Sequence, residues 1–310
     1  MPVQPGVIPS PAHWQGSAEL HPYFMCDVFT SEPLQGNQLG VFIDGRPFAP
    51  AQMQRVAREM NVAETVFILP PAGGGDVRVR IFTPLAELPF AGHPVLGTAF
   101  VVGAALGADA VTLETGAGLV PIALERDGDR IVFGRMSQPI PGWERYEQAD
   151  ELLAALGAER SELPVELYRN GPPHVYVQLA SEQAVAALRP DLAALADLEV
   201  AANCFAGRGG SWKTRMFYPS AGIPEDPATG SAAGPLAIHL ARHGRIRFGE
   251  QIEIRQGAEI GRPSVLYATV TGDRDKINSV EVAGTALIVA EGSFRVTQGG
   301  GPGSGRPDGS

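Results

Sequence analysis

The chain has 310 residues, 44% of them hydrophobic and 19% charged, a composition typical of a soluble globular protein with about two domains of ~150 residues each. Acidic residues exceed basic ones by 34 to 24, and the formal charge of -10 argues against a nucleic-acid-binding protein. The two cysteines, Cys26 and Cys204, are too far apart for a disulfide framework, so a reducing, cytoplasmic setting is expected.

The first half of the chain is predicted to consist of short strands around one buried helix. Residues 1–22 are rich in proline and small polar residues, lack the apolar core of a signal peptide, and are expected to form a flexible leader. Pro50 opens a predicted helix that runs to Met60, and Glu64 follows at the junction with the next strand. Residues 95–106 are predicted to form a helix that is apolar all round and therefore buried on every side. The predicted strands are 24–30, 38–43, 65–69, 77–81, 110–114, 119–124 and 130–135.

The second half repeats this plan. A mostly apolar helix is predicted at 235–243, after the small-residue segment 224–234. The last residues, 298–310, are mainly Gly, Ser, Pro and Arg and are expected to form a disordered tail. The other predicted elements are helices at 149–156 and 181–195, the latter interrupted at Pro190, strands within 165–179 that are broken at 170–173, and strands at 214–218, 252–256, 264–271, 279–283 and 286–290.

This order of elements predicts an α+β protein with an approximate internal duplication. In each half a curved, mostly antiparallel sheet is expected to roll around the central buried helix, because the regular βα alternation of a doubly wound sheet is absent. We expect an N-terminal half at 23–142 and a C-terminal half at 143–297. The boundary stays open, because the final strands can cross back to the first half.

Segments of small residues precede both apolar helices. Gly92 and His93 precede the first helix, and Gly230 and Ser231 precede the second, directly after Thr229. A helix N-terminus has unpaired N–H groups and a partial positive charge, so two such termini facing each other can hold a small carboxylate between the halves. The alternative is that small residues only allow each helix start to pack against its sheet.

Three polar side chains near these segments are candidates for chemistry. Burial of Glu64 beside apolar Val66 would raise its pKa and make it a better proton carrier near neutral pH, although an ordinary solvated glutamate is the simpler interpretation. Asp226 lies just ahead of the second glycine segment, where it either caps a turn or contacts a ligand. His93 lies between Gly92 and proline, a restricted position that favours a functional role over a place on a helix face.

Other common sites lack their signatures. His239 and His243 are four residues apart on a helix, but the segment between them lacks the glutamate of H-E-x-x-H, so no metal is predicted. There is no G-x-x-x-x-G-K-[ST] loop, no G-x-G-x-x-G after a strand and no G-x-S-x-G, which removes the support for nucleotide, nicotinamide and serine-hydrolase sites. No apolar run approaches the ~18 residues of a membrane span, so no membrane partner is expected.

Four motifs, in order and in register, resemble the PhzF family. They are Cys26-Asp-Val-Phe-Thr with Gly36-Asn37, Asn61-Val-Ala-Glu-Thr-Val-Phe67, Glu87-Leu-Pro-Phe-Ala-Gly-His-Pro94 and Glu225-Asp-Pro-Ala-Thr-Gly-Ser-Ala-Ala-Gly234. The resemblance extends from about Tyr23 to Ala290 and implies the diaminopimelate epimerase-like fold, two pseudo-symmetric halves with the site in the cleft. Epimerases of that fold use one cysteine in each glycine-rich loop. The corresponding loops of this chain have none, which excludes a two-cysteine racemase.

The resemblance implies a cofactor-free isomerase that converts trans-2,3-dihydro-3-hydroxyanthranilate to a ketone in phenazine-type antibiotic biosynthesis. Glu64 would take the proton from C3 of the ring and return it at C1, with no second acid and no metal. The resemblance also implies a homodimer with a small carboxylic acid as its substrate. The implied substrate-binding residues are Asn37, Gly92, His93, Asp226, Gly230 and Ser231.

One position departs from the family pattern, and two alternative functions stay open. Pro173 stands in Asn170-Gly-Pro-Pro-His174 where the phenazine enzymes are expected to have arginine, so substrate preference could differ if this position lines the cleft. A second interpretation keeps the fold and Glu64 but assigns another small cyclic or amino acid as substrate. A third, from a different class, is a non-catalytic protein that binds a small acid, and it predicts that Glu64 can be replaced without consequence.

Overall fold

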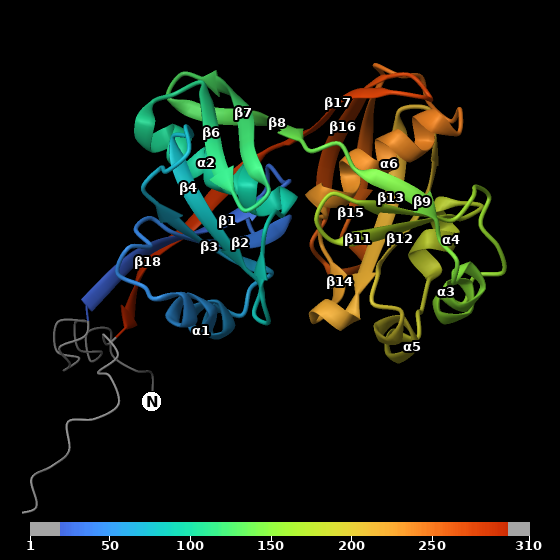
Figure 1. Ribbon diagram of the computed structural model, residues 1–310, viewed down its shortest axis with the longest axis horizontal. Coiled ribbons are helices and arrows are strands. Elements are labelled where there is room, and N and C mark those ends of the chain that lie inside the picture. The colour runs from blue at the N-terminus through green and yellow to red at the C-terminus, as the bar shows by residue number, and fades with distance from the viewer. Residues whose placement is uncertain (1–18, 297–310) are drawn as a thin grey trace, which may run out of the picture.

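Two halves of similar construction lie side by side, each built around one central helix (Figure 1). The structure is a computed structural model that describes residues 19–296, so the predicted leader up to residue 18 and the predicted tail at 298–310 lie outside the described residues. The central helices are α2 (Gly92–Leu106) and α6 (Gly230–Arg242). No helix among the described residues has both the length and the apolar character that a membrane crossing requires.

The first half wraps a curved sheet around α2. Its strands are β1 (Glu19–Val28), β2 (Asn37–Phe42), β3 (Glu64–Leu69), β4 (Val77–Phe82), β5 (Glu87–Leu88), β6 (Ala110–Thr115), β7 (Gly118–Asp127), β8 (Arg130–Gln138) and β18 (Ala286–Val296). They pair in the order β18–β1–β2–β3–β4–β6–β7–β8, with β5 beside β4. Only β2–β3 and β4–β6 are parallel, because helix α1 (Pro50–Met60) and helix α2 provide the crossover connections that parallel pairs need.

The second half repeats the same order of pairings around α6. Its strands are β9 (Gly142–Arg145), β10 (Glu166–Arg169), β11 (Pro173–Gln178), β12 (Ala201–Arg208), β13 (Ser211–Tyr218), β14 (Ile223–Asp226), β15 (Gln251–Gln256), β16 (Ser264–Gly272) and β17 (Ile277–Gly284), and its smaller helices are α3 (Ala149–Leu156), α4 (Glu182–Ala187) and α5 (Leu192–Asp197). They pair as β9–β10–β11–β12–β13–β15–β16–β17, with β14 beside β13 and with β11–β12 and β13–β15 parallel. Strands β1 to β8 therefore correspond to β10 to β17, which is the duplication expected from the sequence.

The halves share one continuous sheet. Strand β17 of the second half pairs with β8 of the first, and β18 then runs back along β1, as the red strand in Figure 1 shows. A side chain also joins the halves, because Arg262 donates from Nη2 to Asp27 Oδ1 at 2.6 Å and from Nε to the Gly36 carbonyl at 2.9 Å. These links hold the loop in front of Asn37 against the second half.

The central helices are buried because their residues are almost all apolar or small. In α2 every residue from Gly92 to Gly103 is buried, and in α6 every residue from Gly230 to Ala241. Glycine brings α2 close to its sheet: a Cβ at Gly97 would lie 2.6 Å from Leu39 Cδ2. The predicted wrapping of a curved sheet around each helix is confirmed.

The predicted starts of both central helices are wrong. Helix α2 begins at Gly92 instead of residue 95, and α6 begins at Gly230 instead of residue 235, so the small residues form first helical turns and not loops. Proline at residue 94 is compatible with a first turn, where its missing N–H would have no partner. Pro235 lies inside α6, where it cannot donate to the carbonyl of Ser231.

Some strands were also missed or misplaced. The sequence of β12, Ala-Ala-Asn-Cys-Phe-Ala-Gly-Arg, did not indicate a strand because alanine and glycine are depleted in strands. The short strands β5, β9 and β14 have too few residues to show a periodic pattern. Strand β1 starts at Glu19, ahead of the predicted start at residue 24, so residues 19–22 belong to the sheet and not to a leader.

Candidate active site

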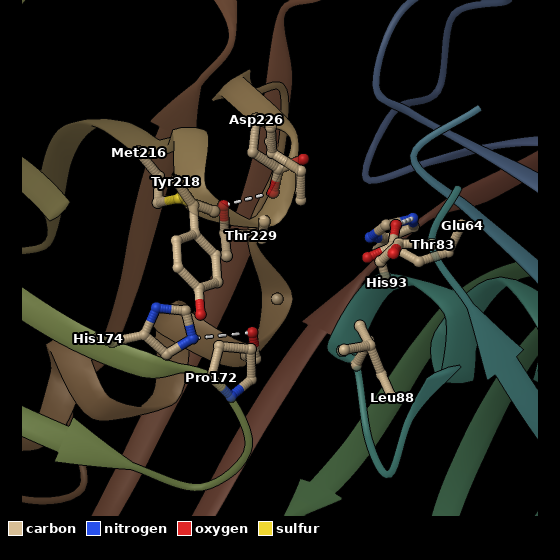
Figure 2. A pocket seen from close by; sticks show the side chains of 16 residues that line it. Glu64, Thr83, Leu88, His93, Pro172, His174, Met216, Tyr218, Asp226 and Thr229 are labelled. Carbon is tan, nitrogen blue, oxygen red and sulfur yellow. Dashed lines mark hydrogen bonds and ion pairs between the residues drawn. The ribbon is translucent and has the colours of Figure 1, made fainter. Parts of the chain in front are cut away.

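A cavity lies between the halves, where the starts of α2 and α6 meet (Figure 2). The first half contributes Glu64, Thr83, Leu88, Ala91, Gly92 and His93. The second half contributes Pro172, His174, Met216, Tyr218, Ala221, Ile223, Asp226, Thr229, Gly230 and Ser231.

The two helix starts touch backbone to backbone. A Cβ at Gly92 would lie 2.5 Å from the carbonyl carbon of Gly230, and one at Gly230 would lie 3.0 Å from His93 N. Neither helix has a side-chain cap, since Ala91 precedes α2 and the Thr229 hydroxyl donates to a carboxylate instead. The first-turn N–H groups therefore have no capping side chain, and their partial positive charges favour an anion at the junction.

Glu64 and His93 form a close buried pair on the first-half wall. Glu64 Oε2 lies 3.0 Å from His93 Nε2, and the side chains are 7% and 4% exposed. The contact is not aligned as a hydrogen bond, and neither atom has a hydrogen-bond partner among the described residues. Local structure sets this position: α1 ends at Met60, Asn61 adopts a left-handed conformation, and Glu64 becomes the first residue of β3. A ligand in the adjoining cavity could supply the hydrogen-bond partners that these two buried atoms lack.

Asn37 links the two halves behind the cavity wall. Its Nδ2 donates to Asp226 Oδ1 at 2.8 Å and to the Ala228 carbonyl at 2.9 Å, and it lies 3.2 Å from His93 Nδ1. Asn37 is fully buried and does not line the cavity, unlike the other predicted site residues. It therefore contacts the residues of both walls rather than the open space between them.

The pKa values of Asp226 and His93, which both line the cavity, are shifted. Burial and the nearby charge of Glu64 raise the pKa of Asp226 to about 6, against the opposing effects of His93 and of the hydrogen bond from Thr229. Burial lowers the pKa of His93, but the charges of Glu64 and Asp226 raise it, and the net shift of this pKa is upward. An acid with a pKa near neutrality beside an imidazole can exchange protons at physiological pH.

We expect Asp226→Asn to remove a pH-dependent loss of stability. A pKa of about 6 in the folded protein, against 3.8 as the ordinary value, means that the folded state binds this proton more tightly than the unfolded state. The resulting stabilisation is complete below about pH 4 and is lost as the pH rises through about 6, a change of roughly 3 kcal/mol. Urea unfolding of both proteins at about pH 4.5 and pH 8 measures it. A difference between variant and wild type that is equal at both pH values would contradict the shifted pKa.

The opposite wall contains a side chain that the sequence analysis did not select. His174 Nε2 lies 3.0 Å from Ser231 Oγ (Figure 2), and both residues line the cavity. A histidine at a strand start directly after two prolines is the signal that could have identified it. Pro172 lines the cavity, whereas Pro173, the position that departs from the family pattern, does not. The sequence analysis also missed other lining residues, among them Thr83, Leu88, Met216 and Tyr218.

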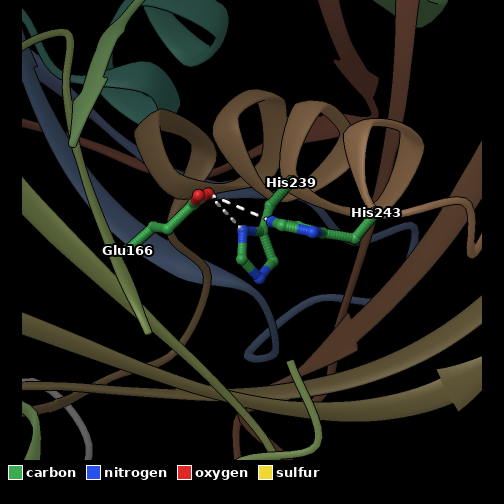
Figure 3. Close-up of side chains that lie close together, drawn as sticks. All are labelled: Glu166, His239 and His243. Carbon is green, nitrogen blue, oxygen red and sulfur yellow. Dashed lines mark hydrogen bonds and ion pairs between the residues drawn. The ribbon is translucent and has the colours of Figure 1, made fainter. Parts of the chain in front are cut away.

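A second, partly buried polar cluster lies beside α6, outside the cavity (Figure 3). Glu166 Oε2 accepts from Arg242 Nη1 at 2.7 Å and from the Tyr168 hydroxyl at 2.8 Å, and it lies 3.2 Å from His239 Nδ1 and 3.3 Å from His243 Nε2. Two histidines and a glutamate are residue types that bind metal ions. Here the guanidinium of Arg242 already neutralises the carboxylate, and a metal ion would have to displace it. We therefore interpret the cluster as an ion-pair network.

The two cysteines lie outside the cavity lining, and both are buried free thiols. Burial raises the pKa of Cys26 to about 12 and that of Cys204 to about 12. Thiols with such pKa values carry almost no thiolate at neutral pH. The geometry therefore agrees with the exclusion of a two-cysteine racemase.

The chain is similar to a known protein family, to curated isomerases and to a solved structure. A family model described as phenazine biosynthesis-like protein, PhzC-PhzF, matches residues 26–292. A curated trans-2,3-dihydro-3-hydroxyanthranilate isomerase from Pseudomonas aeruginosa is 55% identical over 274 residues, which are 88% of this chain and 99% of that protein. One of the same name from Pseudomonas fluorescens is 50% identical over 276 residues, covering 89% and 99%. The crystal structure of a PhzF-family phenazine biosynthesis protein from Bacillus anthracis has a TM-score of 0.79 at 25% identity, covering 90% of this chain and 100% of that one.

Proposed function

The chain belongs to the PhzC-PhzF family of phenazine biosynthesis-like proteins, and we propose that it is a trans-2,3-dihydro-3-hydroxyanthranilate isomerase whose proton carrier is Glu64. The buried Glu64–His93 pair carries this assignment. Both atoms of the 3.0 Å contact lack aligned hydrogen-bond partners and border a cavity at two helix starts without side-chain caps. An acid with an open hydrogen-bonding site beside an anion-binding junction suits proton transfer on a small carboxylic acid.

The reaction moves one proton within the substrate. The Glu64 carboxylate takes the proton from C3 of the ring, the double bonds shift, and the acid so formed delivers the proton to C1. The product enol then becomes the ketone. Substrate and product have the same composition, so the step needs no oxidant or reductant. One carboxylate can serve both carbons if the ring lies flat above it, which agrees with the place of Glu64 on one wall of the cavity.

Negative charge develops along the diene towards the substrate carboxylate during this transfer. The first-turn N–H groups of α2 and α6, and the imidazole of His93, are close enough to the junction to stabilise that charge. Asp226 and His93 then orient the hydroxyl and amino groups, and Ser231 contacts the carboxylate. Contact between Gly92 and Gly230 keeps the halves close together and limits the access of water to the reactive intermediate.

Isomerisation in deuterated water tests the proposed function. We expect purified protein to consume the diene absorbance of trans-2,3-dihydro-3-hydroxyanthranilate, with deuterium or the retained proton appearing at C1 in NMR spectra. A folded protein that leaves the substrate unchanged would reject this substrate and favour another small cyclic or amino acid in the same cavity.

We expect the activity to survive removal of metal ions. Neither the proton transfer nor the charge stabilisation assigned above involves a metal. In the Glu166 cluster, Arg242 already donates a hydrogen bond to the carboxylate. Exhaustive dialysis against EDTA, followed by the absorbance assay, is expected to leave the rate unchanged. A loss of activity that Zn²⁺ restores would contradict this expectation and would point to the Glu166 cluster.

Two further properties belong to the same proposal. A homodimer is expected from the family resemblance, and light scattering coupled to size-exclusion chromatography measures it. A cytoplasmic setting is expected from the two free cysteines, because buried reduced thiols suit a reducing compartment.

A further inference from the structure

His174 connects Ser231, at the start of α6, to Asn203 on strand β12. Its Nε2 lies 3.0 Å from Ser231 Oγ, and its Nδ1 lies 3.3 Å from Asn203 Nδ2. The three residues are only 1%, 5% and 3% exposed for His174, Ser231 and Asn203. His174 and Ser231 line the cavity, and Asn203 lies behind them. These three hydrogen-bonded side chains therefore extend from the interior of the second half to the cavity wall.

Backbone carbonyls determine the orientation of the Asn203 amide. The Asn203 atom that faces His174 also lies 2.8 Å from the Ala201 carbonyl oxygen and 3.4 Å from the Val175 carbonyl oxygen. Carbonyl oxygens only accept hydrogen bonds, so this atom has to be the amide nitrogen. The nitrogen can only donate to His174 Nδ1, which places the imidazole proton on Nε2.

The same surroundings keep the imidazole neutral. Burial lowers the pKa of His174 to about 3, so the ring carries a single proton across the physiological range. Its one N–H group points to Ser231 Oγ, which therefore accepts from His174. The hydrogen of the Ser231 hydroxyl is left to donate to another group.

We propose that His174 is a positioning residue that holds the Ser231 hydroxyl as a hydrogen-bond donor to the substrate carboxylate. The inference rests on the proposed function, because it assigns the carboxylate end of the same cavity. A free hydroxyl can rotate to donate or to accept, and it would tolerate an amino group as well as a carboxylate. A hydroxyl that already accepts from His174 selects an acceptor, and so discriminates between the two ends of an amino acid substrate.

The internal duplication supports this assignment. His93 and Ser231 are the second residues of the two central helices, and each contacts a polar side chain near the start of a corresponding strand, β2 in the first half and β11 in the second. Asn37, the first residue of β2, contacts His93, as His174 near the start of β11 contacts Ser231. The halves differ one strand further on. Strand β3 begins with Glu64 in the first half, whereas β12 begins with Ala201. At this strand start the first half therefore presents an acid, and the second half presents an alanine.

NMR spectroscopy of the full chain tests the tautomer directly. Long-range ¹H–¹⁵N correlation spectra of protein labelled at histidine, with His174→Gln used to assign the signal, distinguish the two neutral tautomers and the imidazolium. We expect the neutral form with its proton on Nε2 from about pH 5 to pH 8. A proton on Nδ1, or an imidazolium in this range, would overturn the proposal. The measurement needs no substrate, so it is independent of the proposed reaction.

Binding of two unreactive ligands tests the consequence. 3-Hydroxyanthranilate is the aromatic counterpart of the substrate, and 2-aminophenol is the same molecule without the carboxylate. We expect His174→Leu and Ser231→Ala each to weaken binding of 3-hydroxyanthranilate by about tenfold or more in calorimetry. We expect neither to change the binding of 2-aminophenol.

The matched variants separate positioning from a structural role. Glutamine at 174 places an amide N–H near the position of Nε2, so His174→Gln is expected to keep wild-type affinity. His174→Leu combined with Ser231→Ala is expected to bind no more weakly than Ser231→Ala alone, because both act on one hydrogen bond. Equal losses for both ligands, or losses that multiply in the double variant, would overturn the proposal. Normal binding with no isomerisation would reject the proposed function and leave the role of His174 intact.

Discussion

Replacing Glu64 by glutamine is expected to lower kcat by roughly 10²–10⁴-fold, the range that a positioned acid–base group contributes. One carboxylate is assigned both the removal of the proton from C3 and its return to C1, so the effect should lie at the upper end of that range. Glutamine has nearly the same shape, and the buried contact with His93 Nε2 at 3.0 Å can be kept by its amide oxygen. The affinity for 3-hydroxyanthranilate should therefore stay within a few-fold of wild type. The diene absorbance assay and calorimetry measure the two quantities.

Glu59→Gln is the matched control, because Glu59 lies on the exposed face of α1 and outside the cavity. We expect it to have wild-type kcat and affinity. A Glu64→Gln protein with substantial turnover would end the assignment of Glu64 as the proton carrier, and unaltered ligand binding alone would then favour a small-acid-binding protein.

Gly92→Ala is expected to lower kcat/KM by about 10²-fold or more while the protein remains folded. The added Cβ would lie 2.5 Å from the carbonyl carbon of Gly230 and 2.6 Å from Ser231 N, so the two helix starts would have to separate. A misplacement of about 1 Å in an active site can cost this factor. The helix itself should not suffer, because alanine has a higher helix propensity than glycine. Steady-state kinetics, with thermal unfolding as the check on folding, measures the effect.

Gly142→Ala serves as the control for this substitution. Gly142 lies on β9, and a Cβ there would meet nothing within 4 Å. It should therefore leave kcat/KM unchanged. Wild-type kinetics for Gly92→Ala would show that the contact between helix starts is not needed for catalysis. Loss of folding in that variant would show that the junction serves stability instead.

Local patterns in the sequence were sufficient for the architecture. The apolar runs after Gly92 and Gly230 predicted two buried helices, and the alternating segments predicted most of the strands around them. Prediction failed where local signals are weak. The alanine-rich strand β12 is held by pairing with β11 and β13, not by its own propensity. The first turns of α2 and α6 consist of residues that also suit loops, so the sequence did not indicate where each helix begins.

The sequence by itself determined the two helices, the duplicated order of strands and, through its motifs, part of the cavity wall. Only the tertiary structure decided which residues meet. Asn37 contacts Asp226 across 189 residues of chain, and His174 contacts Ser231 across 57. Such contacts depend on how strands pair and how the two halves close, because neighbours in the sequence do not specify partners so far away. For this reason His174, which has no local signature of function, becomes visible only beside the start of α6.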